Sequence, residues 1–263
     1  RHPGQAINMV WLKRYLQPEK ATGAAPIELV PYFEYYQQAR GADLCKASIV
    51  KLNVIKHLLE RYQKEQRKEI LIQDVNGEFK TEFFAYSQRQ GYAPNTTARN
   101  FKFIKTVCYH AQTKGIDLHP ELRSIRVRPT PVEKIYLTNA DLDLVRKKKL
   151  PHDYLDNARD WLLISCETGQ RVSDLLRFEK SMIRYSDGVP LLEFSQVKTR
   201  EQMTIPLSSE VMALLKKRKG GFPRKISDQR YNEYIKEVCR LAGITYKVKG
   251  SKINPETNRK ESG

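Results

Sequence analysis

The segment Trp161–Phe178, WLLISCETGQRVSDLLRF, decides the fold of the second half of this chain. Its apolar start predicts the end of a buried helix, and Thr168-Gly169 predicts a break in the backbone. Arg171 follows at once, and a second helical pattern resumes at Val172. This order predicts a guanidinium held at the junction of two buried helices. Such a planar charged fork suits bidentate phosphate binding, although an arginine at a helix end can also simply extend into solvent.

The composition narrows the class of partner. The 263 residues include 47 Lys and Arg against 30 Asp and Glu, which gives a net charge of +17. This charge predicts a polyanionic partner, because basic side chains release counterions from nucleic acid when they bind. An anionic membrane surface is the alternative. The sequence has no run of 18 apolar residues and no dominant basic amphipathic helix, so we expect no membrane partner.

The cysteines indicate a reducing compartment. They are scattered, form no CxxC or His-linked metal spacing, and three of them fall in apolar helical patterns. We therefore predict buried free thiols, no metal site and a cytoplasmic location. No signal peptide is recognised, and the chain begins at Arg1 rather than Met. The four residues are Cys45, Cys108, Cys166 and Cys239.

The first half of the chain predicts an N-terminal arm at residues 1–25 and a helical DNA-binding domain at residues 26–118. Four helices are expected there. The third should follow Asp74 as its N-cap, and the fourth should run from Pro94 to Gly115. Their outer faces are basic, which fits either DNA contact or simple solubility. The candidate DNA contacts on these faces are Lys51, Arg99 and Lys102.

Residues 119–135, HPELRSIRVRPTPVEKI, predict a basic linker, because three prolines forbid a continuous helix. Arg126 and Arg128 are its candidate DNA contacts, and a plain spacer is the alternative. A second domain is expected over residues 136–263. It opens at Thr138, which forms with Asp141 a pattern close to a capping box.

Beyond Phe178 the period becomes alternating and predicts three short antiparallel strands, at residues 182–185, 191–194 and 202–207. Asp187-Gly188 predicts the first hairpin turn, and Lys198 lies in the second connection. Helices are expected again at residues 208–219 and 227–242, followed by a polar tail from residue 247. The predicted fold class is therefore mainly α with a small antiparallel β-sheet.

These residues resemble the tyrosine recombinases, the phage-type integrases, and in particular integrases of mobile elements from Bacteroides-like bacteria. The resemblance covers about residues 26–246. It is carried by the box TGQRVSDLLRF, by the lysine hairpin, and by KISDQRYNEYIKEVCRLAGI, which looks like the helices that precede the second catalytic box. It implies a helical core-binding domain followed by a catalytic domain that is incomplete at its C-terminus.

The resemblance also implies roles for individual residues. Arg171 matches the first catalytic arginine, which holds the scissile phosphate, and Asp174 matches the acid that orients it. Lys198 matches the hairpin lysine, a general acid for the leaving 5′ oxygen. Thr199 and Arg200 lie in the same turn and are weaker candidates for phosphate contact. The reaction needs no cofactor, since a tyrosine forms a 3′-phosphotyrosyl link that conserves the bond energy.

The chain departs from the family pattern after Lys198. None of its five histidines begins a His-x-x-Arg box, and no late tyrosine has the nucleophile's context. We therefore expect that the chain stops before the second box and is inactive alone. The family also implies a tetramer on paired DNA sites, a monomer off DNA, and a nucleoid-associated place in a bacterial cell.

Two other interpretations of the sequence stay open. The first is a non-catalytic DNA-binding protein of the same fold, which the missing nucleophile favours. The second is a metal-dependent transposase, which needs three carboxylates around two metal ions. The candidate acids for it, Asp141, Asp160 and Asp174, all fall on predicted helices.

Overall fold

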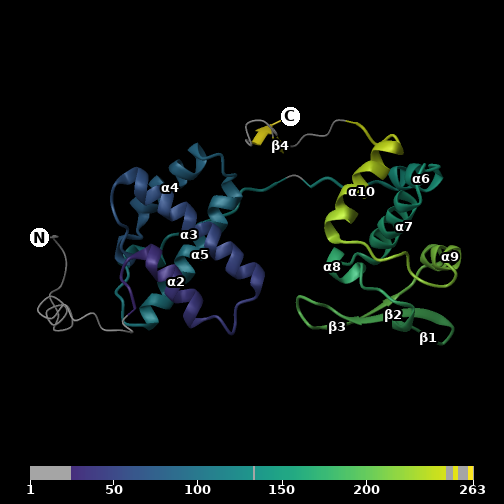
Figure 1. Ribbon diagram of the computed structural model, residues 1–263, viewed down its shortest axis with the longest axis horizontal. Coiled ribbons are helices and arrows are strands. Elements are labelled where there is room, and N and C mark those ends of the chain that lie inside the picture. The colour runs from purple at the N-terminus through teal and green to yellow at the C-terminus, as the bar shows by residue number, and fades with distance from the viewer. Residues whose placement is uncertain (1–24, 133, 247–250, 254–259, 263) are drawn as a thin grey trace, which may run out of the picture. The chain divides into compact units, whose positions relative to one another are not determined.

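The computed structural model describes residues 25–132, 134–246, 251–253 and 260–262 (Figure 1). Apart from residue 25, the predicted N-terminal arm lies outside the described residues. The chain divides into two compact units, one built on residues up to 133 together with the tail from residue 250, and the other spanning residues 134–249. Each unit is described by itself.

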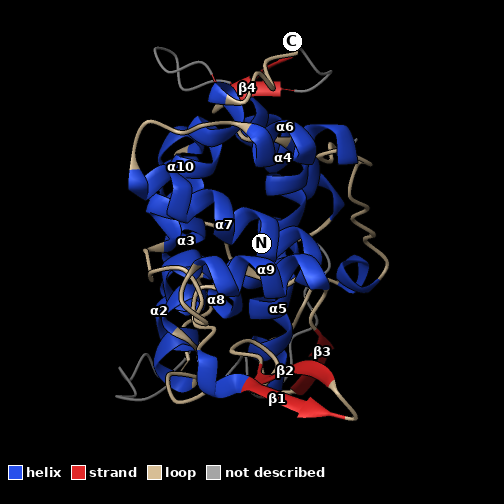
Figure 2. Cartoon of the chain, turned by 90° about the vertical axis from the view of Figure 1, so that its right-hand side faces the viewer, coloured by secondary structure: helices blue, strands red, loops and turns tan. Residues whose placement is uncertain are grey.

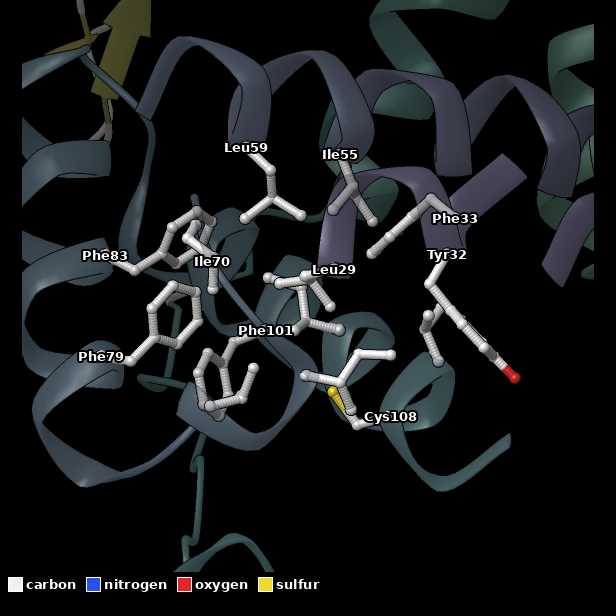
Figure 3. Packing of buried hydrophobic residues seen from close by; sticks show 14 of the residues in the cluster. Leu29, Tyr32, Phe33, Ile55, Leu59, Ile70, Phe79, Phe83, Phe101 and Cys108 are labelled. Atoms are coloured by element: carbon white, nitrogen blue, oxygen red, sulfur yellow. The ribbon is translucent and has the colours of Figure 1, made fainter. Parts of the chain in front are cut away.

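The first unit contains the four predicted helices. Their apolar stripes meet in one core, to which Phe33, Ile55, Phe83 and Phe101 each contribute a fully buried side chain from a different helix (Figure 3). Full burial of such a side chain stabilises the fold by about 1.5–3 kcal/mol. The elements are α2 (Leu29–Ala39), α3 (Lys46–Gln66), the 3₁₀ turn η1 (Ile72–Asp74), α4 (Gly77–Arg89), α5 (Pro94–Thr113) and the 3₁₀ turn η2 (Pro120–Arg123).

One predicted cap is wrong. The N-cap of α4 is Asn76, whose side chain accepts a hydrogen bond from the Phe79 N–H at 2.9 Å. Asp74 lies two residues earlier, at the end of η1, and accepts from the Leu71 N–H at 3.1 Å. Both are good capping residues, so the sequence offered two starts two residues apart. The start of α5 is as predicted, with Pro94 at its first position.

The segment with the three prolines is bound to the first unit over much of its length. Lys105 Nζ donates to the Ile125 carbonyl at 2.8 Å. Further along, Asn95 and Thr130 exchange two hydrogen bonds of 2.8 Å each. Ile125 and Val127 pack against the helical core. Residues 120–130 are therefore fixed on this unit, and only the last residues of the predicted linker lack such contacts in the described part of the chain.

The second unit combines helices with a three-stranded sheet of order β1-β2-β3, in which both pairs are antiparallel (Figure 2). Asp187 and Gly188 form the predicted turn between β1 and β2, with φ angles of 51° and 79°. The elements are α6 (Asn139–Lys147), α7 (Asp153–Thr168), α8 (Val172–Leu175), the 3₁₀ turn η3 (Lys180–Met182), β1 (Ile183–Ser186), β2 (Val189–Ser195), β3 (Gln202–Pro206), α9 (Ser209–Lys217) and α10 (Asp228–Leu241).

Helix α7 is the central element of this unit. Its Trp161 is fully buried and donates from Nε1 to the Arg224 carbonyl at 3.0 Å. Ahead of it, Thr138 and Asp141 form the predicted capping box of α6. In the tail, β4 (Ser251–Ile253) pairs with β5 (Lys260–Ser262), where no strand was predicted. Three residues are too few to show a period of two.

The cysteine prediction is wrong in part. Cys108 is buried in the helical core, and burial raises the pKa of its thiol to about 12. Cys45 and Cys166 are exposed, and Cys239 is half-buried. All four are free thiols. Cys45 precedes the first turn of α3 and Cys166 faces outward from α7, so helical position alone did not determine their burial. Among the described residues, no helix is long and apolar enough to cross a membrane.

Candidate functional site

The break before Arg171 is built by a glycine. Helix α7 ends at Gly169, which has φ of +64°, and its N–H donates to the Ser165 carbonyl at 2.9 Å. This left-handed conformation costs glycine little and other residues more. Arg171 then caps α8 with an extended backbone. Because Ile164 and Leu175 are buried on either side, the exposed side chain of Arg171 leaves the protein at a fixed point.

The guanidinium of Arg171 is hydrogen-bonded to the second hairpin. Its Nη1 donates to the side-chain oxygen Oε1 of Gln196 at 2.9 Å. The same oxygen accepts from the Thr199 hydroxyl at 2.8 Å. The Nε2 of Gln196 donates to Oε1 of Gln170 at 3.3 Å. One carboxamide therefore joins the end of α7 and the start of α8 to the turn between β2 and β3.

That turn presents Lys198 at its tip. The Gln196 N–H donates to the Glu201 carbonyl, and the Arg200 N–H donates to the Gln196 carbonyl, both at 2.9 Å. Arg200 adopts φ of +61°, which closes the turn. Lys198, Thr199 and Arg200 are all exposed. The structure thus places all three predicted turn residues on the strip of chain that Gln196 connects to Arg171.

Asp174 lies beneath this turn and is fully buried. Its Oδ1 accepts from the Val197 N–H at 2.8 Å and from Arg177 Nη2 at 3.2 Å. Arg177 Nη2 also donates to the Ser195 carbonyl at 2.8 Å, where β2 ends. The Asp174 backbone N–H donates to the Arg171 carbonyl at 2.9 Å, but within the described residues the Asp174 carboxylate makes no hydrogen bond to the Arg171 guanidinium, and its Oδ2 has no partner. In this structure its carboxylate holds the turn, and its predicted contact with Arg171 stays a prediction.

Two functional candidates were missed from sequence, Gln196 and Arg177. Both are common polar residues whose importance depends on which backbone group they reach across the fold. The only available signal was position: Gln196 lies two residues before Lys198, and Arg177 lies three after Asp174, a helical spacing that allows an ion pair.

The late tyrosines are engaged elsewhere. Tyr231 is buried, and burial raises the pKa of its hydroxyl despite a hydrogen bond with Ser165. Tyr246 donates to Asp141 Oδ2 at 2.9 Å, and this bond raises the pKa of Tyr246. Tyr234 is half-buried and packs against Tyr154, with ring centroids 4.7 Å apart. Neither a hydrogen bond nor an ion pair connects any of the three with Arg171 among the described residues.

The three carboxylates of the transposase reading are held in separate networks. Asp141 caps α6, and Asp174 holds the hairpin turn. Asp160 is fully buried and pairs with Lys217 at 2.9 Å and with Arg218 at 2.8 Å. Across the described part of the chain, no group of three or more such side chains is placed to hold a metal ion. The geometry therefore favours the arginine and lysine site.

The first unit carries a second candidate surface between α3 and α5. Lys51 Nζ lies 4.2 Å from the centre of the Phe103 ring, and partial burial together with the charge of Arg99 lowers its pKa. Ten residues further along α3, Arg61 donates to the Tyr92 hydroxyl at 3.2 Å. We call Lys51, Arg61 and Arg99 the α3–α5 basic face. The structure brings Lys51 and Arg99 together as neighbours, whereas Arg61 belongs to the predicted basic outer faces but was not among the candidate DNA contacts.

Charge pairing separates this face from the rest of the unit. On the opposite side of α3, Lys56 pairs with Glu34 at 2.7 Å and with Glu60 at 3.7 Å. None of the three cations of the α3–α5 basic face forms an ion pair with a described residue. The other predicted contacts, Lys102, Arg126 and Arg128, are exposed on α5 and on the segment that follows η2. Uncompensated cations are the groups that release counterions on binding a polyanion.

Comparison with known proteins finds two matching family models, one for each half of the chain. Residues 28–121 match the phage integrase SAM-like domain, and residues 132–262 match the phage integrase family. None of the curated protein sequences matches the chain.

Solved structures show the same fold. A lambda integrase dimer bound to a COC′ core site is 15% identical, with a TM-score of 0.62 over 90% of this chain and 72% of that chain. The Tn1549 transposon integrase in complex with a circular intermediate DNA is 12% identical, with a TM-score of 0.67 over 89% and 84%. XerH site-specific recombinase bound to difH substrate is 12% identical, with a TM-score of 0.59 over 86% and 82%.

Proposed function

The chain belongs to the phage integrase family, and we propose that it is a site-specific recombinase that acts on double-stranded DNA through the groups around Arg171. The observation that carries this is the hydrogen-bonded connection from Arg171 through Gln196 to the turn that presents Lys198. The connection ties Arg171 to the exposed turn that carries Lys198, and two cations on these elements would together suit a backbone phosphate.

The reaction follows from these groups. The family's tyrosine attacks the phosphorus, the bond to the 5′ oxygen breaks, and a 3′-phosphotyrosyl link forms. Arg171 binds non-bridging oxygens and stabilises the charge that grows on them in the transition state. Lys198 gives its proton to the leaving 5′ oxygen. Religation reverses these steps without a metal ion or a nucleotide.

Asp174 serves this site as a positioning residue. The hydrogen bond from Val197 to its carboxylate fixes the residue immediately before Lys198. Its second oxygen is buried without a partner among the described residues, so it is an acceptor that Arg171 could use once a phosphate has bound. This keeps the family role of Asp174 as a proposal.

We propose that several groups contact the DNA: the α3–α5 basic face, Lys102, Arg126 and Arg128, and Thr199 and Arg200 beside the catalytic groups. A lambda integrase structure is a tetramer bound to a Holliday junction. We infer that this protein also forms a tetramer on paired DNA sites and that it is a monomer when no DNA is bound. We infer a location in the bacterial cytoplasm, associated with the nucleoid.

The alternative is a non-catalytic DNA-binding protein of this fold. The positions of Tyr231, Tyr234 and Tyr246 favour it for the 263 residues taken alone, because in the described part of the chain each is engaged elsewhere and none is hydrogen-bonded to Arg171. We therefore propose that cleavage needs a tyrosine other than these three.

One experiment separates the two functions. The binding sequence is selected from a random duplex library, nicked beside each candidate phosphate, and incubated with the full-length protein in EDTA. A recombinase gives a protein–DNA adduct that survives denaturant, and Arg171→Ala abolishes it. Sequence-selective binding without any adduct would support the non-catalytic function, and a strict magnesium requirement would exclude the tyrosine mechanism.

A further inference from the structure

The side chain of Gln196 is hydrogen-bonded to the Arg171 guanidinium, the group that the proposed reaction needs for binding phosphate. In the described residues, the hydrogen bond of Arg171 Nη1 to Gln196 Oε1, 2.9 Å long, is the one side-chain contact of that guanidinium. A guanidinium has five N–H donors, so most of this fork has no protein partner. The acceptor is also neutral.

A neutral acceptor is displaceable by a phosphate. The Gln196 oxygen is uncharged and gives Arg171 a single hydrogen bond, whereas a phosphate is ionised and binds arginine through two parallel charge-assisted bonds. Gln196 does not lose its place when Arg171 leaves it. Its Oε1 still accepts from the Thr199 hydroxyl, and its Nε2 still donates to Gln170 Oε1. Its backbone closes the turn through Glu201 and Arg200.

We propose that Gln196 is a positioning residue that holds Arg171 next to the Lys198 turn in the DNA-free protein and yields it to the scissile phosphate. The inference rests on the proposed function. The carboxamide orients the guanidinium before DNA arrives, so that less side-chain freedom is lost when phosphate binds. It does this without adding a negative charge that would compete with the phosphate.

This role predicts different duplex affinities for two substitutions of similar size. Gln196→Glu replaces the neutral oxygen by a carboxylate, which pairs with Arg171 and resists displacement. We expect about tenfold weaker binding of the selected duplex, as for the loss of one charge-assisted hydrogen bond. Gln196→Met removes the acceptor and leaves Arg171 free. Its duplex affinity should stay within about twofold of the wild type, because Arg171 no longer uses the Gln196 bond once it holds the phosphate.

The matched control is Gln202→Glu. Gln202 is exposed, lies at the start of β3 opposite Ser195, and makes no side-chain contact with Arg171 among the described residues. It introduces the same charge into the same hairpin, and its duplex affinity should fall much less than that of Gln196→Glu. A second readout follows Arg171 directly: its Nε–H NMR signal, assigned by its loss in Arg171→Lys, is titrated with inorganic phosphate. That signal should respond at lower phosphate concentration in Gln196→Met than in Gln196→Glu.

The outcomes are distinct. If both Gln196 variants weaken binding equally, or if Gln202→Glu is as weak as Gln196→Glu, the displaceable contact is refuted. If Gln196→Glu does not fold, the comparison of Gln196→Met with the wild type decides, and a large loss of affinity in Gln196→Met refutes the proposal. If the wild type selects no duplex at all, the proposed function itself fails, which is a different result from any of these.

Discussion

The buried carboxylate of Asp174 accepts a hydrogen bond from the Val197 backbone N–H at 2.8 Å, which ties α8 to the turn that carries Lys198. The same oxygen pairs with Arg177. A buried carboxylate is stable only when it is paired and hydrogen-bonded, so Asp174 is part of the fold as well as of the site.

Removing this carboxylate should therefore destabilise the second unit. Asp174→Ala leaves the Val197 N–H and Arg177 without their acceptor, and we expect the free energy of unfolding to fall by about 2 kcal/mol in urea denaturation. Asp174→Asn keeps an acceptor oxygen for the Val197 N–H, so its free energy of unfolding should fall by less than that of Asp174→Ala. Asp143→Asn is the control, because Asp143 is an exposed partner of Arg146, and its change should stay within about 0.5 kcal/mol. Equal losses in all three variants would contradict this role.

The role of Lys198 can be separated from that of Arg171 by the leaving group. Both side chains are exposed, so Lys198→Ala and Arg171→Lys should fold normally. Each should reduce adduct formation by about 10²-fold or more. In a substrate with sulfur in place of the 5′ bridging oxygen, the 5′ thiolate leaves without taking up a proton, since thiols are far more acidic than alcohols. This substrate should restore cleavage by Lys198→Ala and leave Arg171→Lys slow. Rescue of both variants alike would show that Lys198 is not the acid.

Pairing of charges predicts which lysine of α3 binds DNA. We expect the affinity of the wild type to fall about 10³-fold between 50 and 200 mM salt if six or more phosphates are engaged. Lys51→Gln should reduce the slope of log affinity against log salt by about 0.9. Lys56→Gln is the matched control on the same helix, because Lys56 is already paired with Glu34, and its slope should not change. A salt-independent affinity would rule out phosphate contacts by this face.

The periodic and local features of this protein could be predicted from its sequence. Asp187-Gly188 specified its turn because both residues tolerate positive φ, and Gly169 specified the break before Arg171. Features that depend on contacts across the fold could not. The sequence does not show that Gln196 reaches Arg171, or that Asp174 turns toward Val197 and Arg177, because those partners meet only after β2 packs beside α8. Asn95 likewise gave no sign that it holds Thr130.

Acid should weaken the second unit through Asp156. Burial opposes ionisation of this carboxyl, but the hydrogen bond from Lys217 and the charges of Arg159 and Arg218 outweigh it and lower its pKa. A lowered folded-state pKa gives stability that is present above the ordinary Asp pKa of about 4 and is lost as the pH falls through the folded value. Asp156→Asn should flatten the fall of the melting temperature below about pH 4. Asp187→Asn, at an exposed turn, should keep the wild-type profile.

The Asn95–Thr130 pair should protect the segment that leads out of the first unit. Asn95→Ala removes both of its hydrogen bonds to Thr130, and their loss should open residues 125–130 more often. Cleavage by trypsin after the exposed Arg126 should then become about three- to tenfold faster, because proteolysis follows the population of the open form. Asn95→Asp keeps the acceptor for the Thr130 N–H and should lie between Asn95→Ala and the wild type. Asn53→Ala, which breaks a side-chain bond to Gln37 elsewhere on the unit, is the control and should leave this cut unchanged. Equal rates for Asn95→Ala and the wild type would mean that Lys105 and the packing of Ile125 hold the segment without the pair.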